Sequence, residues 1–240
     1  MRKRRLVRTL SLIIFAFGVL LGSALISVAV WGDLEATLFN PGVQADAGLR
    51  SLRCPVMLTE AQEAGTISVR IKNTLDRATS FFARARISEG FLTLMREEKT
   101  QVPLEPGETE RLAWQVSADD AAFGRIIFFR VTISGGYPLP SRLGTCGIVL
   151  VGLPYLTGNQ AYALGVAVSL ISTIGGGWLW ISRHPHRLGI QVQIARIMGL
   201  LTLVILVGLI VSLLGWWVFG LLILVVILLS IGAFISYTVQ

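Results

Sequence analysis

The two cysteines of the chain, Cys54 in LRCPVML and Cys146 in GTCGIVL, carry the chemistry that is easiest to interpret. Each lies in a strand-like segment that is close in sequence to a long apolar run. Disulfide bonds persist in oxidising compartments and are rare in the cytoplasm. If the segment that holds both cysteines is extracytoplasmic, the sequence predicts a Cys54–Cys146 disulfide. Two free buried thiols are the alternative, and a zinc site is disfavoured because no histidine lies near either cysteine.

The other residues that could support catalysis or bind a metal are two histidines and two pairs of adjacent carboxylates. His184 and His186 flank a proline in RHPHR, and we expect them in a solvated loop at the membrane interface. Glu97–Glu98 would point to opposite faces of a strand, whereas a glycosidase needs two carboxylates opposed across a cleft. Asp119–Asp120 fits a solvated turn better than a calcium site. With no nucleophile motif or phosphate-binding loop either, the sequence predicts a protein that is not an enzyme and has no cofactor or metal.

The composition is that of an integral membrane protein. The mean hydropathy is +0.70, and 53% of the 240 residues are hydrophobic. All 14 acidic residues lie between Asp33 and Asp120. The cations outside 33–142 lie only at the ends of apolar runs, as the positive-inside bias predicts: Arg2, Lys3, Arg4, Arg5, Arg8, Arg183, Arg187 and Arg196. Nucleic acid is not an expected partner, because its binding would need cations gathered on a folded surface.

Four apolar runs have the character of membrane-spanning helices. The first, at 10–30, could cross roughly 30 Å of hydrocarbon at about 1.5 Å per residue, and its basic flank predicts a cytoplasmic N-terminus. The alternative is a signal peptide cleaved after residue 29, with Ser27 and Ala29 as the small residues before the cut. The other predicted spans are 161–181, 197–214 and 218–235, which would return the C-terminus to the cytoplasm.

Small residues recur in these runs at the spacing of helix–helix contacts. Such residues let helix backbones approach closely in lipid, so we expect them to pack the spans against one another or against partner subunits. They are Gly18 and Gly22 in the first span, and Gly165, Ser169, Thr173 and Gly177 in the second. The residues expected at the membrane interface are Arg183, Arg187 and Arg196 on the cytoplasmic side and Trp216 and Trp217 on the outer side.

The segment between the first two spans is predicted to fold as an extracytoplasmic β domain. Apolar residues alternate in TISVRIKN and in RLAWQVS, which is the period of half-buried strands. Turn sequences such as SEG, PLEPGE and SGGYPLP separate the β-rich runs. Short strands at near-regular spacing are typical of an antiparallel sandwich. The predicted disulfide would join its first and last strand-like segments.

The run from Thr66 to Ser134 resembles the CARDB-type and related immunoglobulin-like domains of bacterial envelope proteins. In that pattern a strand ends in Asn, a Pro-Gly-Glu turn opens the next strand and a Gly precedes a late strand. Here these positions are Asn73, Pro106–Gly107–Glu108 and Gly124. The resemblance implies a β-sandwich that serves contact or spacing and has no catalytic residues. The cysteine pair and the C-terminal spans are not part of the pattern.

The sequence therefore predicts an α+β membrane protein with an antiparallel immunoglobulin-like β-sandwich plus four transmembrane α-helices, in the inner membrane of a bacterial-type cell. Its expected domains are a basic N-terminus with an anchor helix at 1–31, the extracytoplasmic sandwich at 32–158, and three spans with a short basic loop at 159–240.

The predicted function is that of a non-catalytic interaction protein, an accessory or scaffold subunit of a larger membrane complex. Its expected partners are membrane lipids and other membrane-protein subunits, and the sequence assigns no small-molecule ligand. The middles of the predicted spans hold no ionisable residue, which argues against a pump or an ion-coupled transporter. An extracytoplasmic ligand or stress sensor is the alternative, and a transporter or channel component is the third hypothesis.

Overall fold

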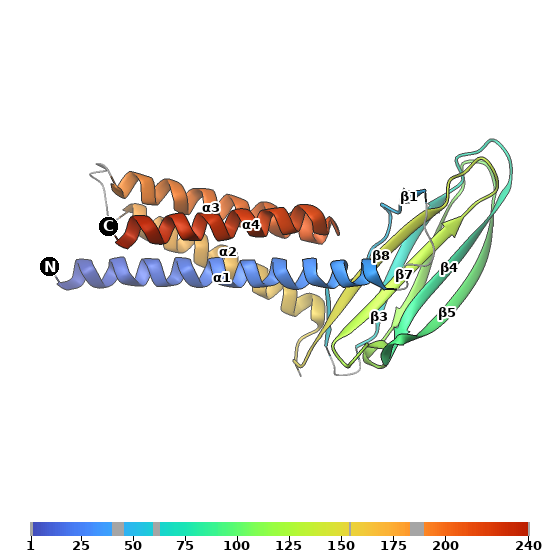
Figure 1. Ribbon diagram of the computed structural model, residues 1–240, viewed down its shortest axis with the longest axis horizontal. Helices are drawn as coiled ribbons and strands as arrows, with labels where there is room; N and C mark the ends of the chain where they lie inside the picture. The colour runs from blue at the N-terminus through green and yellow to red at the C-terminus, as the bar shows by residue number, and fades with distance from the viewer. Residues whose placement is uncertain (1, 40–45, 60–62, 154, 183–189, 240) are drawn as a thin grey trace. The chain divides into compact units, whose positions relative to one another are not determined.

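The computed structural model describes residues 2–39, 46–59, 63–153, 155–182 and 190–239 and divides into two compact units. Met1–Val30 and Tyr162–Gln240 form one unit, which we call the helical unit. Trp31–Ala161 form the other, which we call the β unit. Figure 1 shows the helices of the first and the strands of the second.

The helical unit contains most of α1 (Arg2–Leu38) and α2 (Gly158–Ser182) and all of α3 (Ile190–Leu213) and α4 (Trp217–Val239). Three helical segments of the described chain are long and apolar enough to cross a membrane: Thr9–Leu38, Gly158–Ser182 and Gln193–Leu213. In the described part of α4 the apolar segment is shorter and runs from Trp217 to Gly232.

The β unit contains two sheets. The larger has the strand order β1-β8-β7-β4-β5, with β2 also paired to β8, and the smaller pairs β3 with β6. The strands are β1 (Ala47–Gly48), β2 (Met57–Thr59), β3 (Gly65–Lys72), β4 (Thr79–Glu89), β5 (Phe91–Leu104), β6 (Thr109–Val116), β7 (Ile126–Ser134) and β8 (Arg142–Val151). A short 3₁₀ helix, η1 (Ala118–Asp120), lies between β6 and β7.

The predicted fold class, an antiparallel sandwich plus four transmembrane helices, is wrong in two respects. The larger sheet is mixed, because β1 and β2 both pair with β8 in parallel. Three helices rather than four are long and apolar enough to span a bilayer among the described residues. The apolar segment found in the described part of α4, Trp217–Gly232, has 16 residues and is not one of the three.

Both sheets contribute to one hydrophobic core. Along β3 the alternating Ile67, Val69 and Ile71 are buried, as their period of two predicts. The ring of Trp114 in β6 lies 5.4 Å from that of Phe129 in β7. Burying a side chain of this kind stabilises a fold by roughly 2–3 kcal/mol, so the Trp114–Phe129 contact is a main link between the two sheets.

Asn73 and Gly107 explain the turn that the sequence pattern emphasised. The buried Asn73 side chain donates hydrogen bonds to the carbonyls of Arg77 and Leu104, at 2.8 and 3.0 Å. Gly107 adopts a φ of 77°, a conformation that glycine takes without steric cost, and its N–H donates to the Asn73 carbonyl at 3.0 Å. The turn is thereby fixed to the end of β3.

The last turns of α1 belong to the β unit. Ala36 and Phe39 form a buried cluster with Ala122 and Phe128, in which the rings of Phe39 and Phe128 stack at 5.6 Å. Gly147 in β8 supports this packing, because its N–H donates to the Asp33 carboxylate.

Candidate functional site

The outer face of the larger sheet carries a group of cations that we call the cationic face: Arg84, Arg86, Lys99 and Arg130. Their positions follow from strand alternation, because Ala83, Ala85 and Ile87 point into the core and the residues between them point away from it. Strand register then brings neighbours together. Arg84 pairs with Lys99, and Arg86 lies between Glu97 of β5 and Arg130 of β7.

Glu97 is the carboxylate that holds three of these cations together. Its oxygens lie 3.2 Å from Arg84 Nε, 3.1 Å from Arg86 Nε and 3.0 Å from Lys99 Nζ. The Lys99 ammonium, followed by the Arg86 guanidinium, lowers the pKa of Glu97 below its ordinary value. Glu97 is therefore ionised at neutral pH and cancels one of the four positive charges.

Arg130 is the buried member of the cationic face. Its side chain is 4% exposed, and Nη1 donates to the Phe39 carbonyl at 3.1 Å, at the end of α1. Burial, followed by repulsion from Arg86, lowers the pKa of Arg130. An arginine pKa begins so far above neutrality that the group stays charged at pH 7. The three cations around Glu97, namely Arg84, Arg86 and Lys99, thus leave an excess of two positive charges over that carboxylate.

An open groove of about 690 Å³ runs beside these cations. Phe82 lies in it with 54% of its surface exposed. The other lining residues are mainly cations and short polar side chains: Arg84, Lys99, Thr100, Gln101, Thr132, Ser134 and Ser141. An exposed aromatic ring beside surplus cations and hydroxyl groups fits an acidic surface on another molecule.

The sequence contained a signal for this face that the prediction did not use. In SFFARARI the residues Phe82, Arg84 and Arg86 recur at every second position, which places them on one face of a strand. Their pairing with Glu97 and Lys99 depends on the register of β4 against β5, which a single strand does not encode.

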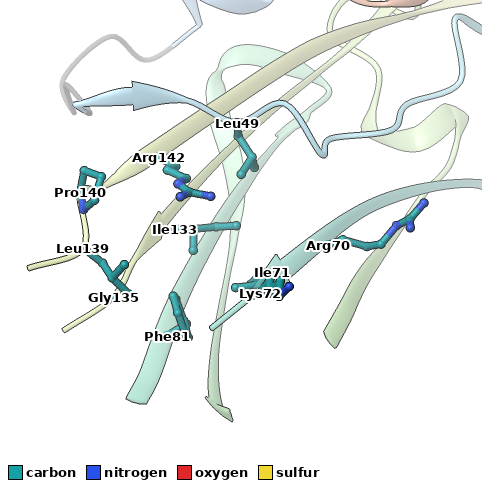
Figure 2. Close-up of a pocket in the computed structure, with 10 residues that line it drawn as sticks. All are labelled: Leu49, Arg70, Ile71, Lys72, Phe81, Ile133, Gly135, Leu139, Pro140 and Arg142. Atoms are coloured by element: carbon teal, nitrogen blue, oxygen red, sulfur yellow. The ribbon is translucent and has the colours of Figure 1, made fainter. Parts of the chain in front are cut away.

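A second pocket, shown in Figure 2, is lined by cations and apolar residues at one end of the β unit. Its lining includes Arg70, Lys72 and Arg142 around Phe81 and Ile133. The cavity volume is about 20 Å³, enough for one or two water molecules. Because small-molecule pockets usually measure about 300–1,000 Å³, this pocket does not fit an organic ligand.

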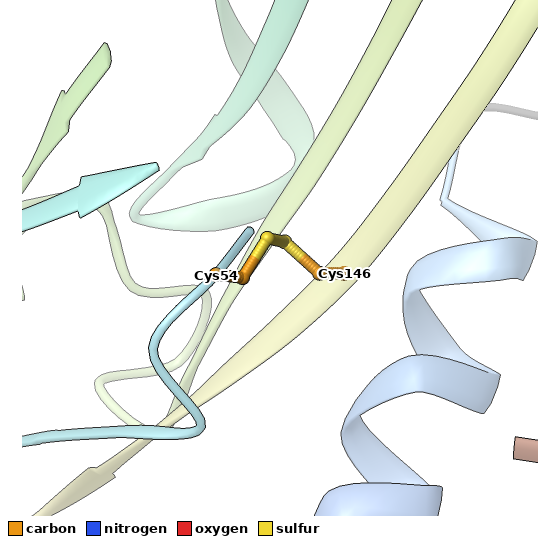
Figure 3. The surroundings of a disulfide bond; sticks show 2 residues. All are labelled: Cys54 and Cys146. Carbon is orange, nitrogen blue, oxygen red and sulfur yellow. A yellow bond between two sulfur atoms is a disulfide. The ribbon is translucent and has the colours of Figure 1, made fainter. Parts of the chain in front are cut away.

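The predicted disulfide is present, with an S–S distance of 1.97 Å between Cys54 and Cys146 (Figure 3). Cys146 lies in β8 with 6% of its surface exposed, directly opposite Phe129. Cys54 follows a short bridge between Arg53 and Ser68. The bond therefore ties the segment before β2 to the core of the β unit.

The predicted helix-packing residues lie mostly at the contact between α1 and α2. Ser169 Oγ donates to the Gly18 carbonyl at 2.8 Å, inside the helical unit. A Cβ on Gly22 would come within 2.6 Å of Ser169 Oγ, and one on Gly165 within 3.3 Å of two Leu25 methyl groups. Thr173 is buried.

Gly177 is not at this contact. A Cβ on Gly177 would meet nothing within 4 Å, whereas one on Gly176 would come within 2.7 Å of the Phe15 backbone nitrogen. Ser11 Oγ donates to the Gly176 carbonyl at 2.9 Å. Gly176 is therefore the residue that allows the close approach.

The other predicted positions fall in different environments. Arg196 and Trp216 are exposed and Trp217 is half-buried, while Arg183, Arg187, His184 and His186 lie outside the described residues. Glu98 contacts Arg96 rather than the cations around Glu97. The buried Asp120 accepts from the Ser117 N–H at 2.9 Å. Among the described residues, no group of three or more His, Cys, Asp or Glu side chains could hold a metal.

Glu63 anchors the first residue of α2 and was not identified from the sequence. Its Oε2 accepts hydrogen bonds from the N–H groups of Gly158 and Thr59 and from the Thr59 hydroxyl, each at 2.8 Å. Burial raises the pKa of Glu63, but these hydrogen bonds outweigh burial and leave the pKa below its ordinary value. A carboxylate at a helix N-terminus is also favoured by the helix dipole.

We expect Glu63→Gln to lower the free energy of unfolding by about 1–2 kcal/mol at pH 7, because hydrogen bonds to a charged acceptor are lost. A carboxyl group whose folded-state pKa is depressed stabilises the fold above its unfolded-state pKa, near 4.5, and this stability is lost as the pH falls through the folded-state pKa. Urea unfolding of the full chain in detergent at pH 7 and pH 3.5 measures the free energy of unfolding of both proteins. The difference between Glu63→Gln and wild type should be smaller at pH 3.5. Glu110→Gln, at an exposed position in β6, is the control and should match wild type. A pH-independent loss would contradict the assignment.

Comparisons with known proteins return only distant structural likenesses. No protein-family model matches the chain, and no curated protein matches it. Among solved structures, a Bacteroides uniformis β-glucuronidase bound to cyclophellitol-6-carboxylate aziridine is 15% identical, with a TM-score of 0.33, over 41% of this chain and 12% of that one. A Listeria innocua β-glucosidase in complex with glucose is 15% identical, with a TM-score of 0.31, over 43% of this chain and 15% of that one.

A CARDB domain is also among the similar structures. It comes from a Pyrococcus furiosus protein in complex with di-metal ions and is 14% identical, with a TM-score of 0.32, over 42% of this chain and 84% of that one. The resemblance seen in the sequence is therefore matched in part. TM-scores this low carry no argument about function.

The prediction that the protein is not an enzyme is not kept: glycosidases are among the structures that part of the chain resembles, and neither an activity nor its absence is assigned. That likeness identifies no reaction, substrate or catalytic residue in this chain, which spans only 12–15% of the length of these glycosidases.

Proposed function

We propose that this protein is a membrane-anchored interaction protein, an accessory or scaffold subunit of a larger membrane complex. In this proposal the cationic face of the β unit binds an acidic surface on a partner subunit, and the apolar helices contact membrane lipids.

Membrane anchoring is supported by the three helices that are long and apolar enough to cross a bilayer. The basic sequence at 2–8 favours a cytoplasmic N-terminus. The Cys54–Cys146 bond favours an oxidising, extracytoplasmic setting for the β unit. A bacterial-type inner membrane would provide both sides.

The observation that carries the partner assignment is the excess of cations on the outer face of the larger sheet. Arg84, Arg86 and Lys99 surround the carboxylate of Glu97, and Phe82 gives an adjacent apolar contact. Charges arranged in this way steer association and select complementary partners. Because exposed charges are screened over about 8 Å at physiological salt, the interaction should weaken as salt rises. Of the two pockets described, the one in Figure 2 is too small for an organic ligand, whereas the open groove has the volume of a small-molecule site and is the place that the sensor alternative would use.

The test is reversal of charge on the cationic face of the full-length protein. We expect Arg84→Glu combined with Lys99→Glu to reduce recovery of the partner at least tenfold after gentle detergent extraction from cells that contain the native complex. A photoreactive amino acid in place of Gln101, which lines the groove, should cross-link to an acidic segment of a membrane protein. Mass spectrometry of the cross-linked peptide identifies that segment.

Lys72→Glu is the matched control, because Lys72 is an exposed cation on β3 in the other sheet. Recovery of the partner with this variant should equal that of wild type. Equal losses for both variants, or a cross-link from position 101 to a segment without acidic residues, would refute the proposed interface.

A further inference from the structure

Phe91 and Phe123 meet at one end of the β unit, and Leu94 lies three residues beyond Phe91 in β5; we call these three exposed apolar residues the apolar tip. Their exposed fractions are 57%, 54% and 63%. The rings of Phe91 and Phe123 meet edge to face, with centroids 6.0 Å apart. Large apolar side chains gathered on a surface usually mark a binding site or a membrane contact.

The apolar tip is a defined structure built from two turns. Gly90, between β4 and β5, has a φ of 69°, and its carbonyl accepts a hydrogen bond from the Phe123 N–H at 2.9 Å. Phe123 itself has a φ of 54°, which is rare for an aromatic residue and is strained. The surrounding turns therefore hold an exposed ring in a conformation that glycine would adopt more easily.

The apolar tip borders the end of α1. Ala122, which precedes Phe123, is buried with Ala36 and Phe39, and Met95, which follows Leu94, packs against the same cluster. The apolar segment of α1 extends to Leu38. Phe123 and Leu94 are therefore adjacent in sequence to Ala122 and Met95. Those two residues belong to the cluster that packs around the end of α1, a candidate membrane span.

The connection to the second candidate span lies at the same end of the β unit. The N–H of Leu150, near the end of β8, donates to the Arg125 carbonyl at 2.8 Å. Leu153 and Tyr155, between β8 and α2, are also exposed, at 37% and 95%. Exposed apolar side chains therefore lie near the end of α1 and between β8 and α2, the two places where the β unit continues into candidate spans. Such a distribution fits a lipid interface rather than open solvent.

We propose that Phe91, Leu94 and Phe123 insert into the boundary between headgroups and acyl chains of the bilayer in which the protein is anchored. The proposal rests on the membrane anchoring in the proposed function but not on the cationic face. Charges near the tip are mixed, with Arg125 opposed by Glu89 and Asp119, all exposed. Insertion should therefore depend on apolar contact and persist in zwitterionic lipid at high salt.

The experiment places an environment-sensitive fluorophore at single positions of the full chain in phosphatidylcholine liposomes. The label is attached at Phe123→Cys without reductant, so that the Cys54–Cys146 bond stays intact. We expect lipids with a spin label near the headgroup to quench this fluorophore at least threefold more than one at Tyr137→Cys. Tyr137 is 90% exposed and lies between β7 and β8, at the end of the unit away from Val149 and Ile126.

A third label at Leu206→Cys, on an exposed position near the middle of α3, is tested with lipids that carry the spin label deep in the acyl chain and reports on anchoring itself. Quenching at position 206 but not at position 123 would refute only the insertion of the apolar tip into lipid. Absence of quenching at both positions would refute membrane anchoring as well. Protection of position 123 from both lipid and aqueous quenchers would show that protein covers the tip, and it would also overturn the proposal.

Phe123→Gly separates insertion from folding. Glycine accepts the φ of 54° without strain, so the variant should be at least as stable as wild type. A fluorophore at Leu94→Cys should nevertheless lose at least half of its lipid quenching when Phe123→Gly is added. Unchanged quenching would show that the exposed ring has no part in membrane contact.

Discussion

Replacing both cysteines by alanine is expected to lower the free energy of unfolding of the β unit by about 4–5 kcal/mol. Cys54 and Cys146 are 92 residues apart in sequence, so the bond closes a long loop and restricts the unfolded chain strongly in the chain-entropy description. Folded domains are stable by only about 5–15 kcal/mol. The loss would remove a large share of the stability, and it is best measured by urea unfolding of the full chain in mild detergent with pulse proteolysis as the readout.

Reduction of the wild-type protein provides the control for this variant. Wild type in dithiothreitol should fall to the stability of the double variant, and the double variant should not respond to the reductant. Labelling of two free thiols in unfolded, unreduced wild type would show that the bond does not form in cells. That result would also remove the main support for an extracytoplasmic β unit.

The strands whose direction is fixed by short turns were predictable from the sequence. In TISVRIKN the alternation identifies β3 and assigns Ile67, Val69 and Ile71 to the core, as observed. The turn at Pro106–Gly107–Glu108 separates β5 of the larger sheet from β6, which pairs with β3 in the smaller sheet. These features are local, because alternation and turn residues act within a few positions.

The parallel pairing of β1 and β2 with β8 was not predictable in the same way. The two strands have two and three residues, too few to show a period. Each pairs with β8 residues that lie more than 90 positions away in sequence, such as Ala47 with Arg142 and Met57 with Val149. Hydropathy alternation carries no information about strand direction.

The helix contacts show a similar division between local pattern and tertiary packing. A repeat of four residues predicted Gly177, but an α-helix has 3.6 residues per turn, so the face that starts at Gly165 reaches Gly176 three turns later.

The end of the first helix also depends on tertiary packing: the predicted anchor ended at residue 30, yet α1 continues to Leu38. The added turns are stabilised by Ala36 and Phe39, which pack on Phe128.

Gly147→Ala is expected to release these added turns of α1 from the sheet and to lower the free energy of unfolding of the β unit by about 3 kcal/mol, the upper end of the usual range for overpacking. A Cβ at position 147 would overlap the backbone carbonyl of Gly32. Backbone atoms cannot rotate out of the way as a side chain can, so either β8 or α1 must move. Movement of α1 would separate Asp33 from the Gly147 N–H and Phe39 from Phe128.

Gly48→Ala is the matched control, because a Cβ at Gly48 would meet nothing within 4 Å and the position lies in β1 of the same sheet. Hydrogen exchange of the full chain in detergent should show faster exchange across Trp31–Leu38 in Gly147→Ala, with wild-type rates in Gly48→Ala. If Gly147→Ala lost stability while exchange across Trp31–Leu38 stayed slow, the strain would lie within the sheet instead. The contact between Gly32 and Gly147 would then not be what holds the end of α1.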